Sequence, residues 1–332
     1  MGHGSGGRMT QELIRDVFSP AFTNPILDQN NDFAGVPLPE VRNGRLIVST
    51  DSHIVKPLIF SGGDIGRLAV CGTVNDVSMS GAVPLYLTAG FILEEGLSVE
   101  TLKSILASMK YSMDEAGVKV IAGDTKVVEK GSGDGIFITA AGVGWIPEGL
   151  EIHGANAKPG DSIIISGTLG DHGIAVLAAR GELGFQTAIQ SDVAPLNHLI
   201  QILLQAAPNT HVLRDPTRGG LATTLNEIAC QSHVGMLLEE DQIPIKNSVR
   251  SACEMLGFDP LYVANEGKVI VIVSENETEA ALAALRTHPY GLDAQVIGKV
   301  LPDNPGRVML KTSIGGTRLL DMLSGEMLPR IC

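Results

Sequence analysis

Short apolar segments alternate with longer amphipathic segments along nearly the whole chain, and this alternation limits the possible folds. Residues 45–50 and 84–93 are rich in Val, Leu, Ile and Ala, as expected of strands, whereas 98–117 has the apolar spacing of a helix. The same alternation returns between 162 and 300. Strands that alternate with helices in both halves predict an α/β protein.

A turn-rich segment, HGANAKPGD at 153–161, divides the chain, and a length of 332 residues suits two domains. We therefore predict an N-terminal Gly-rich loop and helix over 1–35, a first α/β domain over 36–150 and a second over 151–312. No periodicity follows Ser313, so 313–332 is expected to be a flexible tail that carries the terminal Cys332.

Composition and charge exclude several classes of protein. With 24 basic and 37 acidic residues, the formal charge of −13 repels nucleic acid and anionic membranes, and no basic run offsets it. No segment is long and apolar enough to span a membrane, and the N-terminus lacks the apolar core of a signal peptide. Neither nucleic acid nor a membrane is therefore an expected partner, and a cytoplasmic location fits best.

The four cysteines do not form a metal-binding or disulfide pattern. They are scattered, with no CxxC pair, which is typical of reduced thiols in a cytoplasmic protein. Cys71, Cys230 and Cys253 have the settings of small core residues. Cys332 differs because it is the last residue, directly after Pro329, Arg330 and Ile331.

Four aspartates occur at positions that are expected to be buried or to face a cleft, where a charge does not serve solubility. Asp51, Asp124 and Asp215 each follow a predicted strand, and side chains at the carboxyl ends of strands converge on a cleft. Asp76 lies on the otherwise apolar stripe of a predicted helix, which includes Ile65, Leu68, Ala69 and Gly72. A carboxylate in that position needs a compensating partner. Taken one at a time, each aspartate could equally be a helix cap or a turn residue.

Together these aspartates suggest a nucleotide site. Mg²⁺ binds carboxylates together with substrate phosphates. No GxxxxGK[ST] phosphate loop occurs, but Gly-rich segments such as SGGDIG (61–66) and DPTRGG (215–220) can present backbone N–H groups to phosphate. Each segment alone is weak evidence, because turns also use glycine. Asp171 in GDHG is most simply a helix N-cap, and His172 is either a binding group or a neighbour of that cap.

Several motifs, in their order along the chain, resemble those of the HypE family of hydrogenase maturation factors. They are HGSGG, STDSHIVKPLIFSGGDIGRLAVCGTVNDVSMSGA, GFILEEG, GDTKVV, SGTLGDHG, RDPTRGG, NEGK and the terminal PRIC. The resemblance runs from His3 to Cys332. It places the chain in the PurM and selenophosphate-synthetase-like ATP-binding superfamily, with two PurM-like domains. The Gly-rich start, MGHGSGG, could also be a remnant of cloning, but its match to the HGSGG motif of the family argues against that origin.

The resemblance implies a specific reaction. A HypF-type partner is expected to carbamoylate Cys332, and ATP is then expected to drive dehydration of this thiocarboxamide to a protein thiocyanate. The thiocyanate supplies the cyanide ligands of the [NiFe]-hydrogenase iron, through a HypC–HypD-type complex. The enzyme would be a carbamoyl dehydratase and a homodimer.

The resemblance also assigns roles to residues. Cys332 is the carrier, and Glu266 and Lys126 are the bases that remove the amide protons. Mg²⁺ is assigned to Asp51, Asp76, Asp124 and Asp215, and the same aspartates with Asn75, Gly62 and Gly63 are assigned to ATP.

The terminal position of the thiol has a physical rationale. The nine residues from Ser324 to Cys332 can extend about 30 Å, so the thiol can enter two active sites in turn. Arg330 is expected to favour the thiolate, which the terminal carboxylate opposes.

Two other readings remain. A selenophosphate-synthetase-like kinase would need a reactive Cys in the N-terminal Gly-rich loop, which has none. A non-enzymatic thiol carrier leaves the four aspartates unexplained. Prenylation is excluded, since its signal needs a Cys four residues from the end.

Overall fold

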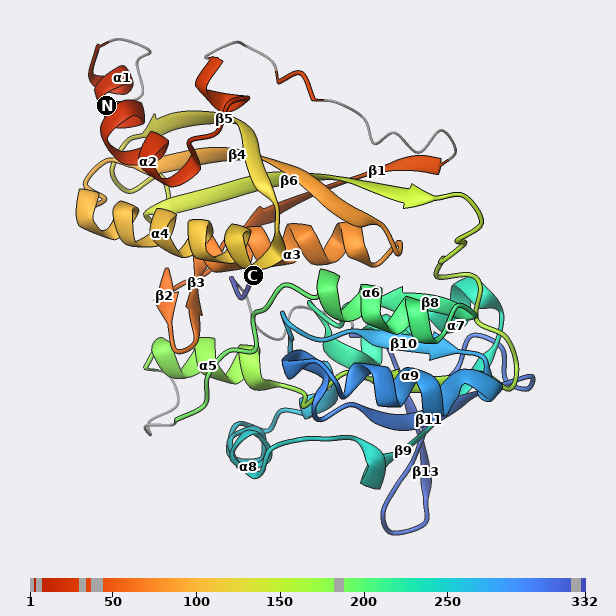
Figure 1. The fold of residues 1–332 in the computed structure, drawn as a ribbon. Coiled ribbons are helices and arrows are strands. Elements are labelled where there is room, and N and C mark those ends of the chain that lie inside the picture. The colour runs from red at the N-terminus through yellow and green to blue at the C-terminus, as the bar shows by residue number, and fades with distance from the viewer. Residues whose placement is uncertain (1–2, 4–7, 30–33, 37–43, 182–187, 324–329) are drawn as a thin grey trace.

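A computed structural model describes residues 3, 8–29, 34–36, 44–181, 188–323 and 330–332. It contains two α/β domains, each built on one sheet, and the C-terminus lies between them (Figure 1). Most of the N-terminal HGSGG motif lies outside the described residues. None of the helices in the described ranges has the length and apolarity that crossing a bilayer requires.

The N-terminal domain has a four-stranded sheet in the order β1-β6-β4-β5. Its strands are β1 (Gly44–His53), β4 (Val83–Glu94), β5 (Lys119–Val128) and β6 (Ile136–Pro147), and its larger helices are α3 (Ile65–Ser78) and α4 (Val99–Ala116). Both helices share one apolar core with the sheet. The first segments are α1 (Arg8–Leu13), a π-helical turn (Ile14–Phe18) and α2 (Ser19–Phe22). Phe18 and Phe22 contact Phe91 of β4, which fixes these segments to the sheet.

The C-terminal domain has a seven-stranded sheet in the order β13-β12-β9-β11-β7-β10-β8. The strands are β7 (Ser162–Ile165), β8 (Thr210–Arg214), β9 (Gly235–Glu239), β10 (Ile270–Val273), β11 (Gln295–Leu301), β12 (Val308–Lys311) and β13 (Thr317–Leu320). The helices are α5 (Asp171–Ala179), α6 (Asn197–Ala206), α7 (Gly220–Ser232), α8 (Asn247–Leu256) and α9 (Thr278–Leu285). Single 3-10 turns occur at Leu27–Gln29, Glu240–Gln242, Pro260–Tyr262, Glu275–Glu277 and Pro289–Gly291.

The strands β7 and β10 explain why this domain has two layers of core. Their sequences, SIII and IVIV, are buried on both faces. Alternate side chains enter different cores: Ile163 and Ile165 pack in one, while Ile164 packs in the other. Helix α7 covers the first core, and α6 with α9 covers the second. An uninterrupted apolar strand is expected where both faces of a sheet are covered.

Most of the predicted elements occur close to their expected positions. Helix α4 begins after Ser98, whose Oγ accepts a hydrogen bond from the Thr101 N–H at 3.0 Å, and ends at Gly117 in the left-handed conformation. The two-domain α/β architecture is confirmed, although the sheets are largely antiparallel. Only β4–β5 and β9–β12 are parallel pairs in the described sheets.

The predicted start of the flexible tail requires a correction. Thr317–Leu320 forms β13, which pairs with β12 at the edge of the sheet, and Leu320 is buried in the core. The sequence showed no periodicity here because this short edge strand leaves its first three residues exposed. A short hairpin, β2 (Ile59–Phe60) with β3 (Gly63–Asp64), was also not predicted.

Helix α3 joins the two domains through polar contacts. The Asn75 amide nitrogen donates hydrogen bonds to the carbonyls of Ala194 (3.0 Å) and Glu266 (3.2 Å), and its oxygen accepts one from the Leu196 N–H (2.8 Å). Asn75 is 1% exposed, so these bonds satisfy a buried amide and hold both domains in one arrangement.

Candidate active site

The last three residues of the chain, Arg330–Cys332, are docked against the segment that follows β1; we call them the docked tail. Ile331 forms an antiparallel bridge with Val55. The Ile54 N–H donates to the Cys332 carbonyl at 3.0 Å, and the Lys56 N–H donates to the Arg330 carbonyl at 3.3 Å. Ile331 is 2% exposed and belongs to the same apolar core as α3 and α4. The chain end therefore binds as a short extra strand with one apolar anchor.

Docking places the terminal thiol beside a cation and an acidic cluster. Arg218 Nη2 donates to Cys332 Sγ at 3.2 Å. Burial raises the pKa of the Cys332 thiol to about 12; Glu266 and Asp51 add to this rise, and Arg218 opposes it. The docked group is therefore a neutral thiol.

This environment corrects the expected role of Arg330. Its Nη1 donates to Asp134 Oδ1 at 2.9 Å. The guanidinium that faces the sulfur belongs to Arg218, and the raised pKa shows that burial outweighs it. Proximity in sequence was a poor guide because Arg330 is not extended: its φ is +53°, and its side chain pairs with Asp134.

Acidic side chains from both domains surround the thiol. Asp51 is contributed by β1 and Asp76 by α3, while Asp215 follows β8 and Glu266 precedes β10. Burial raises the pKa of Asp215 to about 7, and the negative charges of Asp76 and Asp51 contribute. Three of the four predicted aspartates therefore interact electrostatically across the domain boundary.

Glu266 is the most deeply buried acid of this group, at 4% exposure. Burial, followed by the charges of Asp215, Asp192 and Asp51, raises its pKa well above the usual range. Within the described residues, its Oε1 atom has no hydrogen-bond partner. A buried carboxyl group that has a raised pKa and an oxygen without a hydrogen-bond partner is suited to exchanging protons with a group carried on the neighbouring sulfur.

Ser49 and His53 complete the N-terminal side of the site; both lie in the quoted motif that begins STDSH, but neither was predicted to be a site residue. Ser49 Oγ donates to Asp76 Oδ2 at 2.7 Å, and His53 Nε2 lies 3.1 Å from Asp51 Oδ2. Burial acts to raise the pKa of Asp51, but His53, the Ser52 N–H and Arg218 lower it below its usual value. Both residues face α3 along with Asp51, because odd-numbered positions of β1 point to that side.

Gly72 of α3 allows this close approach. A Cβ atom added at Gly72 would lie 2.9 Å from His53 Nε2 and 3.3 Å from Asp51 Oδ2. The apolar stripe that the sequence predicted is buried, and it presents Asp76 one turn beyond Gly72.

Asp124 and Lys126 do not join this cluster within one chain. Asp51 is level with Ala140, Ala89 and Gly123 across the sheet, so these four positions share one face. Asp124 is the next residue and points to the opposite face, where it pairs with Lys126 at 2.8 Å. Both aspartates were predicted to follow a strand, but each lies inside one, Asp51 in β1 and Asp124 in β5, and on opposite faces of the sheet.

Asn75, Gly62 and Gly63, which the resemblance assigned to ATP, have structural roles here. Both donor hydrogens of Asn75 are used inside the protein. Gly62 has a φ of +89°, and a Cβ atom there would lie 2.7 Å from the Ser191 nitrogen. These two glycines line an interdomain cavity instead of the acidic cluster.

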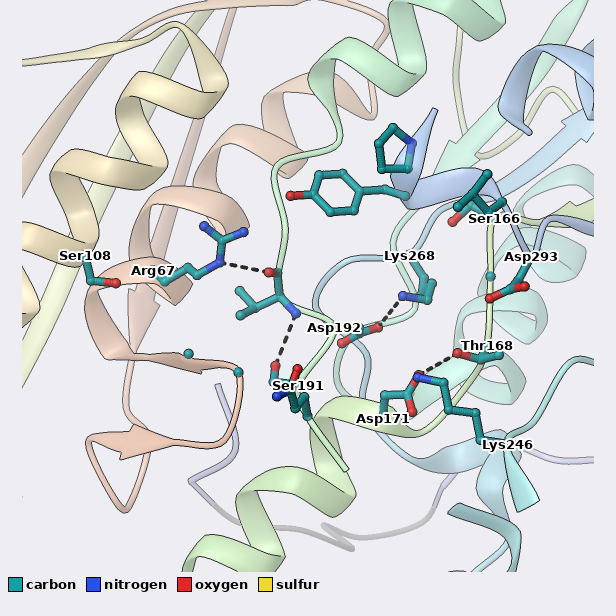
Figure 2. A pocket seen from close by; sticks show the side chains of 18 of the residues that line it. Arg67, Ser108, Ser166, Thr168, Asp171, Ser191, Asp192, Lys246, Lys268 and Asp293 are labelled. Carbon is teal, nitrogen blue, oxygen red and sulfur yellow. Dashed lines mark hydrogen bonds and ion pairs between the residues drawn. The ribbon is translucent and has the colours of Figure 1, made fainter. Parts of the chain in front are cut away.

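That cavity has a volume of about 610 Å³ and is lined by residues of both domains (Figure 2). Its charges are paired within the protein: Lys268 lies 3.0 Å from Asp192, and Lys246 lies 3.0 Å from Asp171. Asp171 is the first residue of α5 and accepts a hydrogen bond from Thr168. Because each cation already has an acidic partner, the cavity provides little net charge for an ionic ligand.

The described residues contain no group of three or more metal-type side chains arranged to hold an ion. Mg²⁺ commonly takes only one or two protein carboxylates and completes its shell with phosphate and water. Burial raises the pKa of Asp215 most, and repulsion from Asp76 and Asp51 adds to the rise; a bound cation would relieve this repulsion. Asp51, Asp76 and Asp215 are thus chemically suited to a cation brought in with a nucleotide.

Comparison with known proteins identifies the class first. The model of the AIR synthase related protein, N-terminal domain, matches residues 32–146, and that of the C-terminal domain matches 158–311. The chain is thus a two-domain AIR-synthase-related protein.

Full-length relatives define the family within that class. The chain is 54% identical over 332 residues to a carbamoyl dehydratase HypE of Cupriavidus necator, covering 100% of this chain and 94% of the relative. It matches the crystal structure of hydrogenase maturation protein HypE in complex with ATP with a TM-score of 0.95 and 50% identity, covering 100% and 99% of the two chains. It matches a chain of a HypE–HypF complex with a TM-score of 0.82 and 52% identity, covering 94% and 99%. The chain belongs to the HypE family of carbamoyl dehydratases.

Docking should protect Cys332 from alkylation in a pH-dependent way. Its pKa rises from 9.0 to about 12 on docking, so this part of the docking free energy is present below pH 9 and is lost as the pH rises toward 12. At pH 8 we expect Cys332 to react more slowly with iodoacetamide than the exposed Cys230, and the protection should decrease by pH 10.

Peptide mass spectrometry measures both rates in one sample. Cys71 and Cys253 are buried internal references, as the sequence predicted, whereas Cys230 is exposed and not the expected core residue. Equal rates for Cys332 and Cys230 at pH 8 would contradict the docked geometry.

Proposed function

We propose that this chain converts its own carbamoylated Cys332 to a thiocyanate, using ATP bound at Asp51, Asp76 and Asp215. The thiocarboxamide and ATP give the thiocyanate, ADP and phosphate. The carbamoyl oxygen leaves in the phosphate, and both amide hydrogens leave as protons. The observation that carries the proposal is the terminal thiol docked beside Arg218, Glu266 and Asp51.

The reaction needs phosphoryl transfer because an amide oxygen is a poor leaving group. Attack of that oxygen on the γ-phosphate of ATP breaks the bond to ADP and forms a better leaving group. Mg²⁺ held by Asp51, Asp76 and Asp215 would neutralise the triphosphate and the charge that develops in transfer. Arg218 is positioned to orient the group on the sulfur. The HypE relative solved with ATP supports use of this nucleotide.

Glu266 is the proposed base for the amide protons. Its pKa is raised, which makes its ionised form a stronger base than an ordinary carboxylate, and its Oε1 atom has no partner in the described part of the chain. Lys126 remains a second candidate from the resemblance alone. It is exposed on β5 and paired with Asp124, so its participation requires contact with another chain.

A homodimer through the open face of the N-terminal sheet is the proposed assembly. Leu46 (48% exposed), Val48 (69%), Val83 (42%) and Ile92 (40%) lie on this face. Strand register places Asp124 and Lys126 on the same face. An exposed apolar sheet face of this kind typically marks a protein interface. A second copy there would also bring both polar residues into contact with another chain.

One proposed partner supplies the substrate group and another receives the product. A HypF-type carbamoyltransferase supplies the carbamoyl group, as the relative solved in a HypE–HypF complex supports. A HypC–HypD-type complex receives cyanide from the thiocyanate. The cytoplasm is the proposed location.

Neutralising the acidic cluster should impair nucleotide use. Asp51→Asn, Asp76→Asn and Asp215→Asn should each weaken Mg·ATP binding or lower turnover by about 100-fold, because each removes charge that opposes the triphosphate–metal complex. Asp241→Asn, on an exposed turn, is the matched control. Isothermal titration measures affinity, and phosphate release measures turnover. Unchanged values in all three variants would exclude the shared site.

Glu266→Gln should separate binding from chemistry. The variant keeps the shape of the side chain, so ATP should still bind, but conversion of carbamoyl to cyano adduct should slow by about 100-fold or more. Intact-protein mass distinguishes the adducts by one water. Glu279→Gln, exposed on α9, controls for the substitution. Wild-type conversion by Glu266→Gln would exclude its role as base.

Val48→Glu should disrupt the homodimer, because it places a charge on the apolar sheet face. Ile314→Glu changes a 94%-exposed residue between β12 and β13 and should leave the molar mass of the homodimer unchanged. Light scattering with size exclusion measures both. A wild-type monomer, or a dimer that tolerates Val48→Glu, would contradict this assembly.

A further inference from the structure

Every backbone carbonyl of the docked tail accepts a hydrogen bond from the body of the protein. The Arg330 carbonyl accepts from Lys56 N–H (3.3 Å) and from Arg180 Nη2 (2.6 Å). The Cys332 carbonyl accepts from Ile54 N–H. The Ile331 carbonyl is held differently, by the side chain of His172 at 2.7 Å. The body therefore recognises the tail largely through its backbone, and one of the contacts comes from a buried histidine.

The position of His172 makes it more than a core residue. It is the second residue of α5, has 0% exposure and packs edge-on against Phe60, with ring centroids 5.5 Å apart. Its Nδ1 lies 2.8 Å from Ser191 Oγ. With one nitrogen on Ser191 and the other on Ile331, the imidazole connects the segment between α5 and α6 to the chain end.

The surrounding hydrogen bonds determine which nitrogen carries the proton. Ser191 Oγ accepts from the Val193 N–H at 3.1 Å, so its own hydrogen is available for His172 Nδ1. The hydrogen of the neutral imidazole then belongs to Nε2, which donates to the Ile331 carbonyl. Burial lowers the pKa of His172, although Asp192 and the Ile331 carbonyl act against this, so the ring stays neutral.

The docked tail is therefore required to satisfy a buried donor. Among the described residues, His172 Nε2 has one hydrogen-bond partner, and that partner belongs to the chain end, 159 residues away. A buried N–H group without an acceptor is costly, so this bond favours docking in one register. Register matters because a shift by one residue would turn the Cys332 side chain away from Arg218 and Glu266.

We propose that His172, held in its Nε2–H tautomer by Ser191, is a positioning residue for the dehydration of the Cys332 thiocarboxamide. It binds the Ile331 carbonyl and fixes the docked register, which sets the sulfur beside Arg218 and Glu266. The effect of this role on dehydration rests on the proposed function. The docking contact itself is independent of that function.

Two readouts test the proposal in the full-length protein with Cys230→Ser as background. The first is the rate at which iodoacetamide alkylates Cys332 at pH 7.5. The second is the carbamoyl and cyano adducts formed with a HypF-type partner, carbamoyl phosphate and ATP, followed by intact mass. His172→Leu removes the donor, and His172→Gln replaces it with an amide N–H near the same place. His198→Leu, on the exposed face of α6, is the matched control.

We expect His172→Leu to raise the alkylation rate of Cys332 by about tenfold, the effect of losing one hydrogen bond in the docking equilibrium. Carbamoylation should persist while dehydration slows, so the carbamoyl adduct accumulates. His172→Gln should recover most of both properties. Ser191→Ala should give an intermediate effect, because it removes the hydroxyl that holds the Nε2–H tautomer of His172 but leaves the imidazole ring in place. His198→Leu should match wild type.

Alkylation and dehydration at wild-type rates in a folded His172→Leu would overturn the proposal. It would also be overturned if His172→Gln were as impaired as His172→Leu, since the ring would then be needed only for packing. If His172→Leu does not fold, as shown by thermal unfolding, Ser191→Ala decides the question by the same two rates. A wild-type protein that forms no adduct would refute the proposed function, while the alkylation rates would still test the docking contact.

Discussion

The backbone pairing between the docked tail and residues 54–56 is the interaction on which the site depends. It uses main-chain hydrogen bonds, which any sequence can make, and obtains its selectivity from Ile331, which enters the N-terminal core. Binding by strand addition gives a defined register with a short segment. The same contact determines where the thiol lies, and therefore which cation and acid surround the group it carries.

The second constraint is the placement of like charges from two domains around one point. Asp51 and Asp76 belong to the first domain, and Asp215 and Glu266 to the second. Their repulsion and burial raise the pKa values of Asp215 and Glu266, a cost that structural residues alone would not explain. The buried amide of Asn75 helps to hold the domains together against this repulsion. The arrangement therefore favours a cationic or proton-donating ligand between the domains.

Local sequence signals predicted the elements and part of the site. The apolar stripe of α3 identified Asp76, and the end of β1 identified Asp51, because both depend on short-range periodicity. Asp124 was grouped with them because the strand end was known but the face was not. Arg218 and the docking of Arg330–Cys332 depend on contacts between distant segments, for which periodicity gives no signal. The edge strand β13 was missed because it is short and leaves three of its four residues exposed, so it lacks a clear alternation.

The central claim is that the terminal thiol, and no other cysteine, carries the reacting group. It is tested most directly by peptide mass mapping after incubation with a HypF-type partner and carbamoyl phosphate, before and after addition of ATP. The account predicts a carbamoyl group on Cys332 that loses one water only when ATP is present. A modification on Cys71, Cys230 or Cys253 with Cys332 unmodified, or a loss of water without ATP, would contradict it.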